Sequence, residues 1–599
     1  MRAGALKGVF KIVAGFEMGY GEKMNILSTF KAALLSSVSF CRDLWTKINS
    51  FSGKALSKKS KKKIIAPEIK TEDEAPLSSA PPSTRVRQYE EHPSSAYMEL
   101  KYRFRDVGRM GAIAETMGRD FLTAMPEGAW KSRLGQIAFM HRRMHDDLTN
   151  DEMRRLLDRA KDHIANHEDD WDVWDKANLR EMEATHDLHA PLTCELTEKR
   201  ARLSYEGRRR HRDALKNGDW PDGREFLSSV VDMNRQVAEM RGRAIGTNSY
   251  YQALVSEYMP GIQVMQIEEW FDDLGAKLNV MLPKILDKQS NEAPPVDITD
   301  FYPAKAQMWL NHALLEAIGF DFQRGGLYET GHNPVEGGTP DDTRLVIKTV
   351  AIDNFLDSMK SALHEGGHGI YIQGLPRTTW RYQPVGQDMG AAVHESQALL
   401  VEMIIGRTKN YFDFLAPRVE GLFHGLHNPM LSAENLHKIK TRVAPSVLRK
   451  KADEVTYFFH MQQRFRLERD MMEGTLKPAD LPEAWNAGLQ DVLGIQPDNV
   501  RDGCLQDVHW FVGKFGYFPS YTIGHMLAAQ LYETIQKDIP DSRAHISQGD
   551  FKPIAQWLGQ NIHAQGRLMG FDSLVKSATG KALSTKPLVR HLEERYLAA

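Results

Sequence analysis

Apolar positions recur at intervals of three and four residues over long stretches of the chain, the spacing that puts them on one face of an α-helix. The clearest stretches are Met98–Phe121, Glu268–Leu286, Met308–Ile318 and Val447–Met472. Alternation of apolar and polar positions, which indicates a strand, is rare, and its clearest example is Arg344–Asp353. The pattern predicts a mainly α-helical protein with one small β-sheet.

Two stretches rich in proline and glycine interrupt the helical pattern and are predicted loops, residues 293–295 and 337–340. No repeat of fixed period is present, so a solenoid is not indicated. The chain has 599 residues, 42% hydrophobic and 26% charged, which is typical of a globular protein with a large core. No uninterrupted apolar run reaches about 18 residues, so we expect no integral transmembrane helix.

Charge and cysteine usage narrow the class of protein further. The formal net charge of −2 gives the chain no basic signature, so we expect no nucleic-acid partner. The three cysteines, Cys41, Cys194 and Cys504, are far apart and form no C-x-x-C pattern. We therefore expect neither a disulfide framework nor a cysteine zinc site, and a reducing, cytoplasmic location fits best.

The N-terminal part differs in composition from the rest. Residues 1–63 contain 13 basic and 3 acidic residues, and a Pro/Ser-rich linker follows at 75–83. We therefore separate an extension, residues 1–92, from the domain at 93–599. Within the extension, apolar residues between Leu27 and Ile48 recur at helical spacing. Three interpretations stay open: a helix that docks on the domain or a loosely ordered tail, contact of residues 1–63 with a membrane surface, and an organelle-targeting peptide.

The sequence His364-Glu365-Gly366-Gly367-His368 contains the pattern H-E-x-x-H within a helix-like stretch. Positions i and i+4 share one face of a helix, so His364 and His368 can bind one metal ion together. Glu365 then lies beside the metal, where it can take a proton from water and pass it to a leaving amine. The pattern indicates a hydrolytic metal centre.

A helix whose histidines are only hydrogen-bonded would show the same pattern, but two features favour a metal. Gly366 and Gly367 each destabilise a helix interior by ~1 kcal/mol relative to alanine, which indicates that another element approaches closely. Glu395 lies 27 residues after His368 and begins a second amphipathic run. A turn and a second helix can return its carboxylate to the metal, and two histidines with one glutamate are a catalytic zinc set.

Several segments resemble, in order, the motifs of the M32 family of metallocarboxypeptidases, the carboxypeptidase Taq type. The resemblance covers roughly residues 95–599. Asn333 departs from the family motif H-P-F and Val346 from the motif D-x-R-x-T. We expect these departures to change the shape of the groove or the reach of the substrate, and neither position is a candidate metal ligand. The segments are His332–Pro334, Asp342–Val346, His364–His368, His394–Gln397, Leu448–Tyr457, Gly503–Trp510 and Phe515–Tyr521.

The resemblance implies a mainly helical, neurolysin-like zinc-peptidase fold with a deep groove and a small β-sheet near the active site. It implies Zn²⁺, sometimes replaceable by Co²⁺, and removal of single residues from peptide C-termini with broad specificity. Members of the family are commonly homodimers. Carried over to this chain, His364, His368 and Glu395 become metal ligands and Glu365 the general base and acid.

Further residues in the matching segments are candidates for substrate binding. A carboxypeptidase must recognise a free carboxylate, which the planar fork of arginine suits, and Arg344 and Arg449 each lie in a matching segment. An ordinary ion pair is the alternative for each arginine. His509, Tyr517 and Tyr521 are candidates for stabilising the oxyanion that forms during hydrolysis, or they are packing residues.

Two alternatives to a carboxypeptidase remain. An oligopeptidase would cut peptides internally in a similar groove, and it would also act on substrates whose C-terminus is amidated. A non-catalytic peptide-binding protein would keep the fold, but binding alone has no need for Glu365.

Overall fold

The structure is a computed structural model, and it describes residues 93–598 except 300, 331–334, 349–353 and 425–427. The predicted extension, residues 1–92, lies outside this range, so its apolar stripe and the boundary at residue 93 stay predictions. None of the helices in the described part of the chain combines the length and apolarity needed to cross a bilayer.

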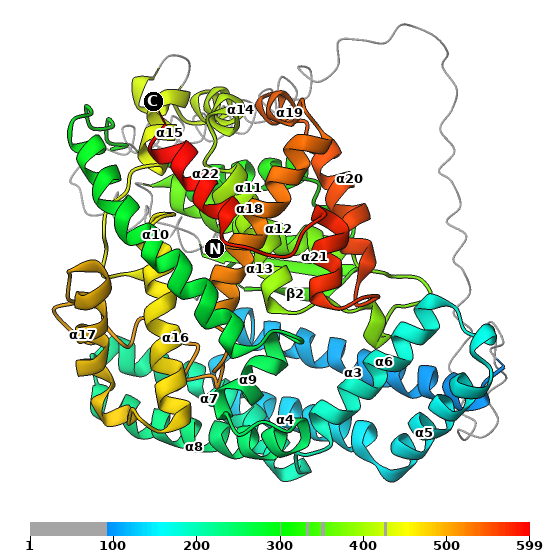
Figure 1. Cartoon of the computed structure of the whole chain (residues 1–599). Coiled ribbons are helices and arrows are strands. Elements are labelled where there is room, and N and C mark those ends of the chain that lie inside the picture. The colour runs from blue at the N-terminus through cyan, green and yellow to red at the C-terminus, as the bar shows by residue number, and fades with distance from the viewer. Residues whose placement is uncertain (1–92, 300, 331–334, 349–353, 425–427, 599) are drawn as a thin grey trace, which may run out of the picture. The chain divides into compact units, whose positions relative to one another are not determined.

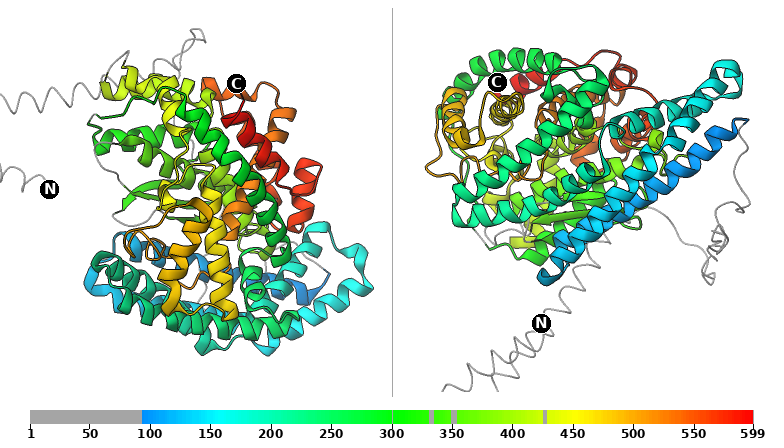
Figure 2. Two further views of the ribbon diagram at one scale, coloured as in Figure 1. Left: turned by 60° about the vertical axis from the view of Figure 1, so that its left-hand side comes forward. Right: turned by 90° about the horizontal axis from the view of Figure 1, so that it is seen from below.

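Long helices make up the first half of the described chain (Figure 1). Helix α3 begins after Ser94, whose side chain accepts a hydrogen bond from the backbone N–H of Tyr97. It packs along α4 and α5, as the right-hand view of Figure 2 shows. The predicted helices at 98–121 and 268–286 are confirmed as α3 and α10. The bounds are α3 Ser95–Thr123, α4 Trp130–Thr149, α5 Asp151–Asn166, α6 Val173–His189, α7 Cys194–Asn217, α8 Trp220–Ile245, α9 Tyr250–Tyr258 and α10 Val264–Ser290.

Helix α11 (Ala304–Ile318) confirms the predicted helix at 308–318. A small three-stranded sheet follows it. Its strands are β1 (Gly325–Thr330), β2 (Val335–Thr339) and β3 (Asp342–Lys348), in the order β1-β3-β2. β3 lies between a parallel neighbour, β1, and an antiparallel one, β2. The predicted strand at 344–353 is therefore confirmed as far as residue 348, and residues 349–353 are not described.

The predicted loop at 337–340 is wrong, because its first three residues belong to β2. Gly337 and Gly338 have φ values of 158° and 125°, and Gly338 lies so close to β3 that a Cβ there would be 2.0 Å from the carbonyl oxygen of Asp342. The glycines indicate a loop in the sequence, whereas in the fold they allow the edge strand to approach its neighbour closely. Thr339 still pairs with Asp342, so the turn itself is very short.

The second half of the chain surrounds the sheet with shorter helices. Helix α12 lies against α11, β2, β3 and α13, and α13 packs closely against α18. A π-helix, Leu400–Ile405, continues α13. The bounds are α12 Phe355–Gly374, α13 Ala391–Leu399, α14 Lys409–Val419, α15 Ala433–Lys440, α16 Tyr457–Glu473, α17 Leu481–Leu493, α18 Pro519–Asp538, α19 Ser542–Gln548, α20 Lys552–Asn561, α21 Phe571–Thr579 and α22 Lys586–Tyr596.

The predicted helix at 447–472 starts ten residues too early, because α16 begins at Tyr457. The side chain of Asp453 accepts hydrogen bonds from the backbone N–H groups of Val455 and Thr456 at 2.9 Å each. This local turn competes with helix formation in the preceding segment. The apolar spacing of that segment therefore reflects packing against the core rather than helix.

Hydrophobic side chains of the described residues form one large continuous core, a smaller one, and a third cluster of Ala214, Leu505 and Phe511. The large core extends from α8 to α22 and includes α12, α13 and α18, which lie next to one another. The smaller core joins α3, α5 and α6 at the N-terminal end of the domain. The helices that carry H-E-x-x-H and Glu395 therefore lie within the best-packed part of the molecule, which fixes their positions.

Candidate metal centre and its surroundings

Helix α12 presents the H-E-x-x-H residues from a rigid position. Its N-terminus is capped by the Asn354 side chain, which accepts a hydrogen bond from the N–H of Leu356 at 3.0 Å. Glu365 and His368 are almost fully buried, with 5% and 2% of their surfaces exposed, and the side chain of His364 is 22% exposed. The predicted helical setting of this motif is confirmed.

The two glycines of the motif mark close contacts with other helices, as the sequence predicts. A Cβ at Gly367 would lie 2.5 Å from the carbonyl oxygen of Gln397 and 2.6 Å from the Cα of Ala398, both backbone atoms of α13. A Cβ at Gly366 would lie 2.3 Å from Cδ2 of Leu315 on α11. The missing side chain at Gly367 therefore lets α13, with Glu395, approach α12.

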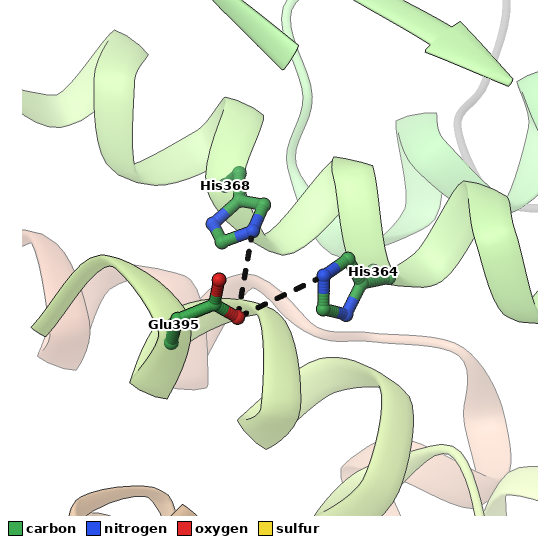
Figure 3. A group of neighbouring side chains, drawn as sticks. All are labelled: His364, His368 and Glu395. Atoms are coloured by element: carbon green, nitrogen blue, oxygen red, sulfur yellow. Dashed lines mark ion pairs between the residues drawn. The ribbon is translucent and has the colours of Figure 1, made fainter. Parts of the chain in front are cut away.

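His364, His368 and Glu395 point toward one another from these two helices (Figure 3). Their nearest ligand atoms all lie within 4.8 Å of one another. Nε2 of His364 is 3.8 Å from Oε2 of Glu395, and Nε2 of His368 is 3.9 Å from the same oxygen. Two imidazole nitrogens and a carboxylate oxygen that converge in this way match the donor set of a catalytic zinc site.

The other ring nitrogen of each histidine is held by an acceptor. Nδ1 of His368 lies 3.0 Å from the carbonyl oxygen of His394, which can only accept, so Nδ1 donates. Nδ1 of His364 lies 2.9 Å from Oε2 of Glu402. These contacts fix both rings with Nε2 facing the carboxylate of Glu395, and such contacts are the usual way in which metal-bound histidines are oriented.

Glu402 is a candidate functional residue that the sequence analysis missed. It lies in the π-helix after α13, and its other oxygen is 3.6 Å from Nζ of Lys360 and 3.8 Å from Nη2 of Arg407. Burial alone raises the pKa of Glu402, but these cations and His364 outweigh it and hold the pKa far below its ordinary value. The available sequence signal was weak: an acidic residue in an apolar run, seven positions after Glu395.

Tyr517 contacts a predicted metal ligand directly. Its hydroxyl donates a hydrogen bond of 2.9 Å to Oε1 of Glu395. The loop that carries it is held by Glu468 of α16, which accepts from the N–H of Gly516 at 3.1 Å and from Nε1 of Trp510 at 2.9 Å. Burial raises the pKa of Glu468 to about 8. Tyr517 is therefore placed to orient the ligand carboxylate.

Arg449 lies in a buried charge network. Its Nε is 2.8 Å from Oδ1 of Asp507, and Nη2 of Arg464 is 2.6 Å from Oδ2 of the same carboxylate. Burial raises the pKa of Asp507, but the two guanidinium groups outweigh it and keep that pKa well below its ordinary value. Arg449 therefore forms the ion pair that was the alternative to binding a substrate carboxylate. The same ion pair also fixes the position of its guanidinium group.

His509 and Tyr521 lie beside this network. The hydroxyl of Tyr521 is 3.3 Å from Nε2 of His509, and the guanidinium of Arg449 is 5.6 Å from the Tyr521 ring centroid. Burial, with Arg449 nearby, lowers the pKa of His509 well below its ordinary value, so the ring is neutral. The Tyr517 ring also packs against the rings of His509 and Tyr521, so the structure brings four of the five predicted substrate-binding residues together.

Arg344 is not part of this cluster. It lies on β3 and is hydrogen-bonded to Asp342 and to the hydroxyl of Tyr328. Within the described residues, no hydrogen bond or ion pair joins it to the metal-ligand candidates or to Arg449. Val346, which departs from the family motif, is buried on the same strand with 2% of its surface exposed.

A cavity of about 610 Å³ has His394, the residue before Glu395, in its wall. It extends between helices α3, α4, α6 and α7 and is bordered by residues 337–340 of the β2–β3 hairpin. A space of this size fits a peptide-sized ligand. The predicted groove therefore has a counterpart that reaches α13, the helix of Glu395.

Comparisons with known proteins agree with this geometry. Residues 99–596 match the sequence model of the family described as carboxypeptidase Taq (M32) metallopeptidase. The chain is 31% identical over 513 residues to thermostable carboxypeptidase 1 of Thermus thermophilus, a match that covers 84% of this chain and 99% of that protein. It is 28% identical over 505 residues to thermostable carboxypeptidase 1 of Pyrococcus furiosus, which covers 83% of this chain and 98% of that protein.

Solved structures show the same fold. Metallocarboxypeptidase 1 of Trypanosoma cruzi superposes with a TM-score of 0.79 at 30% identity, and the match covers 84% of this chain and 100% of that one. A carboxypeptidase of Pyrococcus furiosus superposes with a TM-score of 0.77 at 27% identity over 85% of this chain and 100% of that one. The predicted mainly helical fold with a small sheet is confirmed.

Proposed function

The chain belongs to the carboxypeptidase Taq (M32) family of metallopeptidases and is a metallocarboxypeptidase, and we propose that it uses zinc to release single C-terminal residues from peptides with broad specificity. The observation that carries the proposal is the convergence of His364, His368 and Glu395. Their facing nitrogen and oxygen atoms lie within 4.8 Å of one another, next to the buried Glu365.

In this proposal His364, His368 and Glu395 hold Zn²⁺, with Co²⁺ as a substitute. Two imidazoles and one carboxylate leave the coordination open for water and substrate, and zinc bound there supplies Lewis-acid chemistry at the scissile carbonyl. Glu365 accepts a proton from the attacking water and donates it to the leaving amine. Glu402 and the carbonyl of His394 keep the two histidine rings in orientation.

The surrounding residues bind the substrate. Arg449 is the better candidate for the C-terminal carboxylate, because Asp507 fixes its guanidinium beside Tyr521. Arg344, on the strand β3, is the second candidate. Tyr521 and His509 are proposed to stabilise the oxyanion, and Tyr517 has the same proposed role in addition to its hydrogen bond with Glu395.

Assembly and location are further proposals. The resemblance to the family supports a homodimer, and the cysteine usage supports a cytoplasmic location. The basic residues 1–63 support contact with an anionic membrane surface as an alternative, with organelle targeting as another. Vesicle binding by the full chain that weakens with salt, and that is lost when residues 1–92 are removed, would support membrane contact.

The activity is tested with a short N-blocked peptide in two forms, one with a free and one with an amidated C-terminus. Each is incubated with the protein as purified, after chelation, and after zinc is restored. We expect stepwise release of C-terminal residues from the free acid only, lost on chelation and recovered with zinc. Internal cleavage of both peptides would favour the oligopeptidase, and peptide binding without metal-dependent turnover would favour a non-catalytic role.

A further inference from the structure

The cavity beside His394 has an excess of positive charge in its walls. Two of its arginines are matched by acids: Arg381 is 2.5 Å from Asp341, and Arg567 is 3.8 Å from Glu181. A third, Arg208 on α7, has no hydrogen bond or ion pair with any residue that the structure describes. Arg208 therefore presents an uncompensated guanidinium to the cavity.

Burial makes this charge costly. It lowers the pKa of Arg208, and Tyr205 is the single nearby group that acts in the opposite direction. A partly buried cation without a partner is unfavourable, so an excess charge at this position is typical of a site for an anion. Burial also lowers the pKa of His141 in the same cavity, so that ring is neutral and adds no charge.

Arg119 on α3 supplies a second guanidinium on the opposite wall. Its ion pair with Glu115 is long, 3.9 Å, and Glu115 also accepts a hydrogen bond from the N–H of Gly338 at 3.1 Å. Burial lowers the pKa of Arg119 and outweighs the opposing effect of the carboxylates of Glu115 and Asp342. Arg119 is therefore only weakly compensated.

Tyr205 links the two walls. It is three residues before Arg208 on α7, so the two side chains share a helix face. A Cβ at Gly118 on α3 would lie 2.4 Å from its hydroxyl oxygen, which shows how closely the hydroxyl approaches α3 beside Arg119. Among the described residues this hydroxyl has no hydrogen-bond partner. Two guanidinium groups and a hydroxyl donor therefore line one part of the cavity.

We propose that Arg208, Tyr205 and Arg119 form a subsite for an acidic side chain of the peptide substrate, on the N-terminal side of the scissile bond. The inference rests on the proposed release of single C-terminal residues. Because only one residue then lies beyond the scissile bond, a cavity of about 610 Å³ whose wall includes His394, the residue before Glu395, belongs to the upstream part of the peptide. Guanidinium groups recognise carboxylates through paired hydrogen bonds.

The test uses N-acetylated peptides with free C-termini that carry one glutamate at each of the positions two to five residues upstream of the scissile bond. Each is compared with the same peptide carrying glutamine, and kcat/KM is measured for both. We expect the ratio of the two kcat/KM values to reach about tenfold at the best position, the discrimination of a charge-assisted hydrogen bond. The ratio should fall toward one in Arg208→Gln and be largely kept in Arg208→Lys.

Arg212→Gln is the matched control, because Arg212 is an exposed residue of the same helix that pairs with Asp213 at 3.5 Å. It should keep the wild-type ratio. A wild-type ratio near one at every position would overturn the inference, and so would a preference that Arg208→Gln leaves unchanged. Hydrolysis of the glutamine peptides in either case leaves the carboxypeptidase proposal standing.

If no peptide is hydrolysed, the affinity of the protein for the glutamate and glutamine peptides tests the proposed subsite. Fluorescence anisotropy of labelled glutamate and glutamine peptides is measured on the metal-loaded Glu365→Gln variant, with and without Arg208→Gln. About tenfold tighter binding of the glutamate peptide, lost with Arg208→Gln, would support the subsite although the proposed reaction had failed. Equal binding of both peptides would overturn it.

Discussion

Nδ1 of His364 lies 2.9 Å from Oε2 of Glu402, a carboxylate on the π-helix that continues the helix of Glu395. One continuous segment, α13 with its π-helical extension, therefore carries both a proposed metal ligand and the group that orients another ligand. A π-helix shifts the residues after it around the helix axis, and such insertions are frequent at functional sites. Here the π-helix contains Glu402, whose carboxylate contacts His364 on α12.

We predict that Glu402→Gln weakens metal binding about 10- to 100-fold, the usual effect of changing a group that orients a metal ligand. The substitution keeps the size of the side chain but removes the negative charge that faces Lys360 and Arg407. Metal affinity is measured by competition with a chromophoric chelator. Glu434→Gln on α15 is exposed and should behave as the wild type, whereas an unchanged affinity in Glu402→Gln would remove this role.

The Glu365→Gln variant should bind metal as the wild type does but lose turnover by about 10²- to 10⁴-fold, because glutamine cannot accept the proton of the attacking water. Metal content by elemental analysis and peptide hydrolysis are measured on the same preparation. Substantial activity in a metal-loaded Glu365→Gln protein would contradict the assignment of Glu365 as the base. Loss of the metal itself would instead place Glu365 among the groups that build the centre.

The histidines of the candidate metal centre could be proposed from the sequence because their spacing is local. His364 and His368 meet through the geometry of one helix turn, and the glycines between them indicated correctly that another element approaches. Glu395 followed from its residue type and its position at the start of a second amphipathic run. The fold class likewise followed from apolar spacing, which α3, α10 and α11 match closely.

Features that depend on tertiary contacts could not be found in this way. Glu402 acts through a contact across 38 residues, and Arg464 reaches Asp507 across 43. Gly337 and Gly338 indicate a loop by their local preference, but pairing with β3 makes them a strand. The segment before Tyr457 shows helical spacing, yet it ends in a turn in which the side chain of Asp453 accepts hydrogen bonds from the backbone N–H groups of Val455 and Thr456.

Gly367→Ala should destabilise the protein and weaken metal binding, although alanine is the better helix former by ~1 kcal/mol. The new Cβ would lie 2.5 Å from the backbone of α13, which cannot give way without moving Glu395. Overpacking of this kind costs about 1–3 kcal/mol. The melting temperature and the metal affinity are both measured, and both should fall.

Gly366→Ala serves as the matched comparison, since its Cβ would meet the tip of the Leu315 side chain instead of backbone. That side chain can rotate, so the loss of stability should be smaller and the metal affinity should stay near the wild-type value. If the two alanine variants lost metal affinity equally, the approach of α13 to Gly367 would not be what positions Glu395.

Asp507→Asn should lower the free energy of unfolding by about 3–5 kcal/mol, because it leaves the buried cations Arg449 and Arg464 without their carboxylate.

The pH dependence of this stabilisation follows from the direction of the pKa shift of Asp507. The pKa of Asp507 is depressed in the folded protein, so its stabilisation is present above the ordinary carboxyl pKa of 3.8 and is lost as the pH falls below it. The difference between wild type and variant should therefore be constant near neutral pH and shrink below about pH 4. Urea unfolding midpoints across this range measure it, with the exposed Asp498→Asn as control. A difference that does not shrink in acid would show that Asp507 does not hold the two arginines through its charge.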